Sequence, residues 1–245
     1  MTYCVGMQLD DGLIFMSDTR TNAGFDNVSS FRKMHSWETP GERTITLVSA
    51  GNLATTQAVV SILDARNKAS DERVSSLLEV PSMFQAARVV AQTLRAVIAE
   101  HAEDGKPTDS AFAATMILGG QIAGGPPRLF LIYPEGNFIE AGPDTPFFQI
   151  GEMKYGRPIL VRAYDPAMGF DAAMKLLLVS FDSTLKANLT VGPPFDYHLY
   201  KANSLKLGNN GRIEAEDPYF QLISRDWGDA LKHALDSLPN FTPHE

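Results

Sequence analysis

The chain has 245 residues, of which 44% are hydrophobic and 20% charged, and its formal net charge at pH 7 is −8. This composition is that of a globular protein large enough to bury a core without a metal or disulfide staple. An acidic chain with no cluster of Lys and Arg lacks the basic patch that binds phosphates, so we expect no nucleic-acid partner. Its apolar runs are shorter than the about 20 residues that a membrane-spanning helix needs, so we expect no membrane partner either.

The first fifty residues have the features of β-strands. An Asp10-Asp11-Gly12 turn separates two apolar stretches, as in a hairpin, and a third stretch ends at Gly51. After Gly51 the apolar spacing changes to the 3.6-residue period of a helix. A second helix follows Ser82, which can cap it. We predict strands at 2–8, 13–17 and 44–50, and helices from 53 onward and at 82–103, the second ended by Gly105 and Pro107.

The second half of the chain returns to strands. Turn signals at 134–136 and 209–211 separate β-rich stretches, and the Gly-Pro-Pro at 192–194 breaks a helix. We predict strands at 111–118, 128–133, 137–141, 147–150, 195–201 and 212–215, and helices at 171–187 and 219–238. This order favours an α+β fold of two antiparallel sheets with helix layers outside. No linker divides the chain, so we expect one domain, residues 1–245.

The single cysteine, Cys4, cannot form an internal disulfide, which favours a reducing compartment. The chain start has neither the basic residues nor the apolar stretch of a signal peptide, so we expect a cytoplasmic protein. Cys4 lies in an alternating run, where a small buried side chain is its usual role. A nucleophilic Cys4 is the minor alternative, because Cys4 is not adjacent to the cleavable Met1.

Thr2 is the first candidate for chemistry. A small second residue normally allows removal of Met1, which leaves Thr2 with a free α-amine. One residue then holds a nucleophilic hydroxyl and a base, because an α-amine has a pKa of about 7.7–8.0. Threonine at this position is common, so the signal depends on the residues that accompany it.

Three later residues have a spacing that suits Thr2. A hairpin through 10–12 returns the chain, and with it Asp18, toward Thr2, and Lys33 can then lie between them. A buried ammonium near Thr2 would lower the pKa of its hydroxyl, and Asp18 would hold that ammonium in place. Gly51 precedes a predicted helix, so its N–H could stabilise an oxyanion.

Four features of the chain are Thr2, Ser-Asp-Thr-Arg-x-x-x-Gly at 17–24, Arg-Lys at 32–33 and Ser-Ala-Gly at 49–51. Together they resemble the pattern of proteasome β-subunits, which are N-terminal-nucleophile (Ntn) hydrolases. Three further stretches are similar to the bacterial ancestral β-subunit family, called Anbu. These stretches are residues 3–6, 180–184 and 191–194. The resemblance implies a four-layer αββα sandwich and a homo-oligomer that forms a large ring or an open spiral.

By position, the resemblance implies that Thr2 is the nucleophile, Asp18 and Lys33 the charge pair, and Gly51 the oxyanion amide. Two further roles follow in the same way. Arg20 matches the Arg that follows the motif Asp, and Asn22 lies where the family binds substrate through main-chain atoms.

One departure concerns the Ser and Asp that orient the Thr amine in proteasome subunits. By alignment, Phe112 stands in place of the Ser and Val161 in place of the Asp. Asp182 and Ser183, on the third long helix, are substitute candidates, although such a helical pair is usually on the surface. This departure is the reason for weighing non-proteolytic alternatives.

The leading hypothesis is a threonine hydrolase that cleaves peptide bonds. A non-proteolytic amidase or acyltransferase and an inactive scaffolding subunit are the alternatives. We expect a peptide or small amide as substrate and no cofactor, and the five histidines lack the spacing of a metal site. The sequence does not determine the natural substrate, the ring size or whether an unfolding ATPase is a partner.

Overall fold

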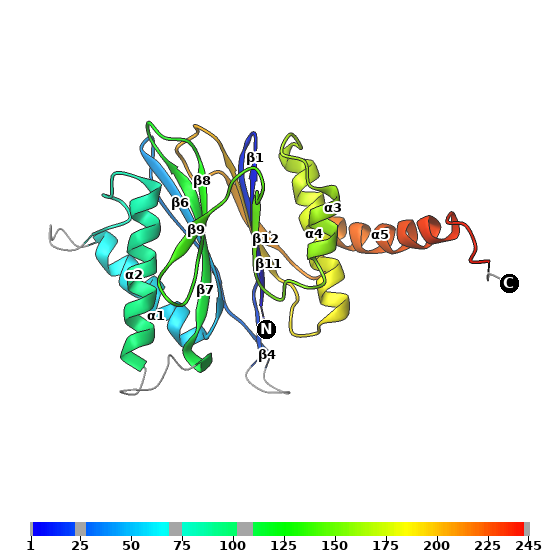
Figure 1. The fold of residues 1–245 in the computed structure, drawn as a ribbon, viewed down its shortest axis with the longest axis horizontal. Coiled ribbons are helices and arrows are strands. Elements are labelled where there is room, and N and C mark those ends of the chain that lie inside the picture. The colour runs from blue at the N-terminus through cyan, green and yellow to red at the C-terminus, as the bar shows by residue number, and fades with distance from the viewer. Residues whose placement is uncertain (1, 23–27, 69–74, 102–109, 243–245) are drawn as a thin grey trace.

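The computed structural model describes residues 2–22, 28–68, 75–101 and 110–242. Two five-stranded antiparallel sheets face each other, and helices cover both outer faces (Figure 1). This arrangement confirms the predicted αββα sandwich. Within the described ranges, none of the helices combines the length and the apolar character needed to cross a bilayer.

The first sheet has the strand order β10-β1-β2-β11-β12, and every neighbouring pair is antiparallel. The hairpin predicted around Asp10 and Asp11 joins β1 to β2. The strands are β1 (Tyr3–Leu9), β2 (Gly12–Asp18), β10 (Phe147–Gly151), β11 (Phe195–Lys201) and β12 (Asn209–Ile213).

The second sheet has the order β5-β6-β7-β8-β9, again antiparallel throughout. Its strands are β5 (Met34–Thr39), β6 (Arg43–Gly51), β7 (Ala114–Ile122), β8 (Arg128–Ile132) and β9 (Phe138–Glu140). A separate pair, β3 (Arg20–Asn22) and β4 (Val28–Ser30), follows β2.

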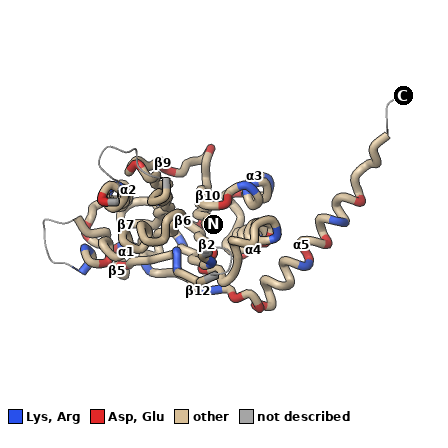
Figure 2. Tube along the Cα trace, turned by 90° about the horizontal axis from the view of Figure 1, so that it is seen from below, with Lys and Arg blue, Asp and Glu red and all other residues tan. Residues whose placement is uncertain are grey.

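Helices α1 (Leu53–Lys68) and α2 (Met83–His101) cover the second sheet. Helices α3 (Arg157–Ala163) and α4 (Phe170–Ala187) cover the first. The last helix, α5 (Pro218–Asp236), leaves the body as an arm (Figures 1 and 2). Asp217 caps α5, because its Oδ1 accepts a hydrogen bond from Phe220 N at 2.9 Å.

The alternation of side chains along β1 builds two of the three core layers. Tyr3 and Val5 point to the layer beneath α3 and α4, whereas Cys4 points between the sheets. Gly6 also lies between the sheets, where a Cβ would stand 2.8 Å from a methyl group of Ile117. The close approach of the two sheets therefore requires glycine at this position.

Several predicted boundaries were wrong. The strand predicted at 111–118 begins only at Ala114, because residues Ser110–Phe112 form a short 3-10 helix. The turn predicted at 209–211 is the first part of β12. Strands β3, β4 and β5 and helix α3 were not predicted. The end predicted for the second helix, with Gly105 and Pro107, lies outside the described residues.

We predict that Gly6→Ala lowers the free energy of unfolding by about 1–3 kcal/mol, because the added methyl overpacks the space between the sheets. Gly142→Ala is the matched control, since nothing lies within 4 Å of a Cβ added there, and we expect a change of no more than about 0.5 kcal/mol. Urea denaturation measures both. Equal effects of the two substitutions would contradict the close-approach argument.

Candidate active site

Thr2 is held at the start of β1 by the end of β10. Its carbonyl oxygen accepts a hydrogen bond from Glu152 N at 2.7 Å. Gly151 has a φ of +82°, and a Cβ added there would stand 1.9 Å from the Thr2 oxygen. Only glycine fits this contact, so β10 fixes the main chain of Thr2. The Thr2 residue itself is half-buried.

Asp18 and Lys33 form a buried ion pair beside Thr2. Lys33 Nζ lies 2.8 Å from Asp18 Oδ1, and the two residues are 5% and 0% exposed. The same Oδ1 accepts a hydrogen bond from Tyr3 N at 3.1 Å. One carboxylate oxygen therefore binds both the Lys33 ammonium and the main-chain N–H of the residue that follows Thr2.

The ammonium has a second anchor in the main chain, since Lys33 Nζ also donates to the carbonyl oxygen of Arg20 at 2.6 Å. Burial raises the pKa of Asp18 to about 6, and the attraction of Lys33 is the largest opposing effect. The pair is consequently complete above about pH 6 and loses its carboxylate charge below it.

Gly51 ends β6 at the N-terminus of α1. Its φ is +120°, and an added Cβ would stand 2.4 Å from the carbonyl oxygen of Ala113, so glycine is required. Asn52, which the sequence analysis did not single out, caps the helix: its Oδ1 accepts from Thr55 N at 3.0 Å. Asn before an apolar helical repeat was the signal that could have identified this cap. Gly51 is exposed and lies where the helix dipole is positive.

The side chain of Arg20 anchors the segment 188–194, which connects α4 to β11. Its Nη1 donates to Leu189 O at 2.8 Å, and a Cβ on Gly192 would stand 2.5 Å from its Cζ. Thr19 holds the other end, because both its N and Oγ1 donate to Pro194 O. For Asn22, the main chain lies in β3 opposite Val28.

Asp182 is buried, with 4% exposure, and its Oδ1 has no hydrogen-bond partner among the described residues. The expectation of a surface position was therefore wrong for this residue, whereas Ser183 is half-buried. It is instead Ser180 of α4 that approaches β1, with its Oγ 2.7 Å from the hydroxyl of Tyr3. Asp182 and Ser183 are not brought to Thr2 by any hydrogen bond seen in the described part of the chain.

The two positions aligned with the orienting Ser and Asp lie in different elements of the fold. Val161 lies on α3 and is 58% exposed. Phe112 lies in the 3-10 helix, where its carbonyl oxygen accepts from Thr55 Oγ1 at 3.0 Å, beside α1. The residues against Thr2 are Gly151 and Glu152, which the sequence analysis missed.

A cavity of about 340 Å³ is formed by residues of β5, β6 and α1 and by Arg32. It is lined by Arg32, His35, Ser49, Thr56, Gln57, Val60 and Ser61. Two of these residues are close to site residues in the chain, because Arg32 precedes Lys33 and Ser49 stands two residues before Gly51. Over the same described ranges, no three His, Cys, Asp or Glu side chains are grouped to hold a metal ion.

The profile of the family described as proteasome subunit matches residues 2–193. The chain therefore belongs to the proteasome subunit family, whose fold it has.

Within that family the chain groups with the ancestral β-subunits, as the sequence resemblance predicted. It is similar to Anbu from Yersinia bercovieri, with 45% identity, 100% of both chains covered and a TM-score of 0.93. Anbu from Hyphomicrobium sp. strain MC1 shows 46% identity over 99% of this chain and 100% of that chain, with a TM-score of 0.91. The structure described as the helical assembly of the Anbu complex from Pseudomonas aeruginosa shows 45% identity over 98% of both chains, with a TM-score of 0.91. No curated protein matches the chain.

We predict that Lys33→Met costs about 3 kcal/mol of folding free energy at pH 8, because it leaves a buried carboxylate without its cation. An acid whose folded-state pKa exceeds its unfolded value favours folding at low pH and loses that contribution as the pH rises through the folded pKa. Without Lys33 the pKa of Asp18 rises further, so the loss should shrink at pH 5, where Asp18 is protonated.

Urea denaturation at one protein concentration measures the loss at both pH values. The exposed Lys175→Met on α4 serves as the control for removing a lysine, and we expect almost no effect of it at either pH. A loss for Lys33→Met that is the same at pH 5 and pH 8 would show that the Asp18 charge is not the cause.

Proposed function

We propose that this protein is a cytoplasmic threonine hydrolase that cleaves amide bonds of peptides, with Thr2 as the nucleophile after removal of Met1. The observation that carries the proposal is the buried Lys33–Asp18 pair, whose Oδ1 also binds the N–H of Tyr3. A scaffold has no need of a buried ammonium at the start of β1, because burying the two charges costs desolvation energy.

In the proposed reaction, Thr2 Oγ attacks the carbonyl carbon while the α-amine takes the hydroxyl proton. The Gly51 N–H stabilises the oxyanion, and Lys33 favours the ionised hydroxyl electrostatically. The C–N bond then breaks, and the leaving amine takes the proton from the α-ammonium. The acyl group remains as an ester on Thr2 Oγ.

Water completes the cycle. The α-amine removes a proton from a water molecule, which adds to the ester carbonyl. The ester C–O bond breaks, and Thr2 Oγ regains the proton from the α-ammonium. The cavity beside Arg32 and Ser49 would accept a substrate side chain, and its wall of mostly polar residues favours a polar one.

We predict that Thr2 reacts with an electrophile selective for N-terminal threonine, such as a peptide epoxyketone. Intact mass should show loss of Met1 in the unlabelled protein and one adduct after labelling. Thr2→Ala should abolish labelling, and Lys33→Ala should slow it by about 10²–10⁴-fold, as expected for loss of a group that acts on proton transfer. Lys175→Ala should label at the wild-type rate.

Retention of Met1 in protein that hydrolyses peptides would exclude Thr2 as the nucleophile. A non-proteolytic amidase is the second candidate, because Phe112 and Val161 provide no orienting Ser and Asp. Turnover of small amides without turnover of fluorogenic peptides would favour the amidase. Lys33→Ala with unchanged activity on every substrate would favour a scaffolding subunit.

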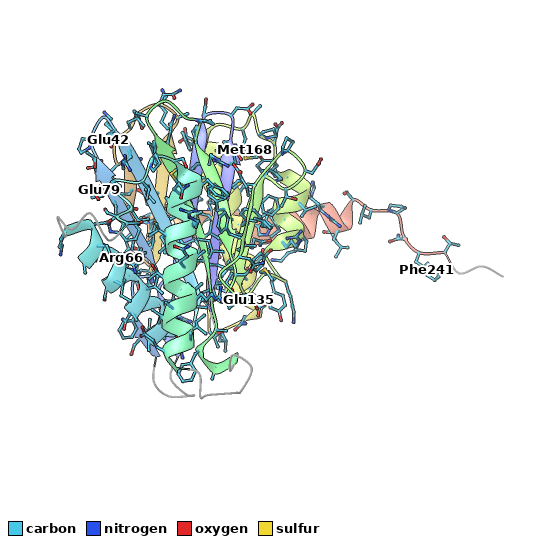
Figure 3. All side chains as sticks on the ribbon, turned by 60° about the vertical axis from the view of Figure 1, so that its left-hand side comes forward. Glu42, Arg66, Glu79, Glu135, Met168 and Phe241 are labelled. Atoms are coloured by element: carbon cyan, nitrogen blue, oxygen red, sulfur yellow. The ribbon has the colours of Figure 1, made fainter. Side chains whose placement is uncertain are left out.

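We also propose that the protein assembles with copies of itself, as the description of the Pseudomonas aeruginosa relative states for that protein. The apolar stripe of α5 supports this. Phe220, at its base, packs on the body and is 4% exposed, but further along the same face Leu231 and Leu235 are 50% and 69% exposed. Phe241, beyond the helix, also lies away from the body (Figure 3). A second subunit would cover this stripe.

We predict that the double substitution Leu231→Glu and Leu235→Glu converts the assembly to smaller species, because two charges would enter an apolar contact. His233→Glu, on the opposite face of α5, should leave the assembly intact. Sedimentation velocity distinguishes these results. An assembly unaffected by the double substitution would mean that other surfaces hold the copies together.

A further inference from the structure

The contact between β1 and β10 brings a carboxylate beside Thr2. The register pairs Cys4 with Ile150 and Tyr3 with Gly151. One step further, Thr2 stands opposite Glu152, and the hydrogen bond from Glu152 N to Thr2 O continues the ladder. Directly opposite residues of an antiparallel pair have Cβ atoms about 4.5–5.5 Å apart.

The Glu152 side chain is buried and held in place. Glu152 is 7% exposed, and its Oε2 accepts a hydrogen bond from Asn188 Nδ2 at 2.9 Å. Asn188 is fixed in turn, because its Oδ1 accepts from Thr190 N and Thr190 Oγ1 at 3.0 and 2.6 Å. The carboxylate is therefore positioned by the same 188–194 segment that Arg20 anchors.

The charge of Glu152 has no cationic partner in the ion pairs of the described residues. Its other hydrogen bond is a long one, 3.4 Å, to the main-chain N of Lys154. A buried carboxylate is costly unless a cation or several donors compensate it. Removal of Met1 would create a new cation, the α-ammonium of Thr2, one residue across the ladder from this carboxylate.

We propose that Glu152 is the positioning residue for the α-amine of Thr2, in place of the Ser and Asp that Phe112 and Val161 do not supply. This inference rests on the proposed function. Glu152 would accept a hydrogen bond from the α-ammonium and turn the amine toward Oγ. It does not take part in bond making; Thr2 performs both proton transfers.

A glutamate that positions the α-amine should change the pKa of that amine, whereas a purely structural glutamate should not. A carboxylate next to an ammonium favours its charged form, so Glu152 should raise the pKa of the Thr2 α-amine. Replacing the carboxylate with an amide of the same shape should lower that pKa, and the free amine should then be available at lower pH.

Periodate oxidation tests the consequence without any catalytic activity, because periodate cleaves a 1,2-amino alcohol such as an N-terminal threonine only through its free amine. The pH midpoint of the oxidation rate reports the pKa of the α-amine. We expect Glu152→Gln to lower this midpoint by about one pH unit, and Glu152→Asp, which keeps the charge, to shift it much less. Mass spectrometry of the N-terminal peptide follows the reaction.

Glu135→Gln, at an exposed site between β8 and β9, is the matched control and should leave the midpoint unchanged. If the host retains Met1, the same variants are produced with a cleavable leader that exposes Thr2. If Glu152→Gln does not fold, Asn188→Ala, which releases the carboxylate, should lower the midpoint in the same direction.

A midpoint that is the same in Glu152→Gln, Glu152→Asp and wild type would overturn the proposal, even if Thr2 reacts with the electrophile. Conversely, a shifted midpoint in protein whose Thr2 does not react would support the role of Glu152 and reject the proposed hydrolase. Where Thr2 does react, its labelling by the epoxyketone should also become slower in Glu152→Asp, because the shorter side chain turns the amine less well toward Oγ.

Discussion

The buried ion pair between Lys33 and Asp18 is the interaction on which the site depends. Asp18 ends β2 in the first sheet, and Lys33 precedes β5 in the second, so the pair connects the two sheets at the end where β1 begins. Burying two charges costs desolvation energy that their attraction only partly offsets. In the proposed function, the role of the pair is the electrostatic field that it creates near Thr2 rather than a contribution to stability.

Hydrogen bonds of backbone and side-chain groups connect this pair to the residues around Thr2. The carbonyl oxygen of Arg20 accepts from the ammonium, and the Arg20 side chain holds the segment 188–194. That segment carries Asn188, which binds Glu152, and Glu152 binds the carbonyl of Thr2. These contacts connect the residues around Thr2 to one another, so a displacement of one of these residues is opposed by its bonds to the others.

The sequence predicted the elements whose pattern is long enough to be distinctive. Strands β2 and β6 and helices α4 and α5 were found within a few residues of both ends, and helices α1 and α2 within a residue of their starts, because their apolar spacing repeats several times. Helix α3 has only seven residues, and among them only Leu160 is buried. Its sequence therefore shows no apolar repeat at the 3.6-residue spacing of a helix. The short strands β3 and β4 depend on pairing with each other.

The site also contains residues that a local sequence pattern reveals and residues that only the fold brings together. Asp18, Lys33 and Gly51 could be predicted because each belongs to a local motif at the end of a strand or before one. Glu152 could not, because its position beside Thr2 arises from a strand pairing between segments about 150 residues apart, which local spacing does not encode. The alignment that pointed to Phe112 and Val161 compares local stretches of sequence, and it carries no information on this pairing.

Cys4 gives the molecule a practical property. It is the only cysteine of the chain, it is fully buried between the sheets, and burial raises the pKa of its thiol. Thiol reagents react with the exposed thiolate, so the native protein should be inert toward maleimides. A single cysteine placed on the α5 arm would then be the one accessible attachment point for a fluorophore or cross-linker, and energy transfer between such labels would report whether copies of the chain come together as proposed.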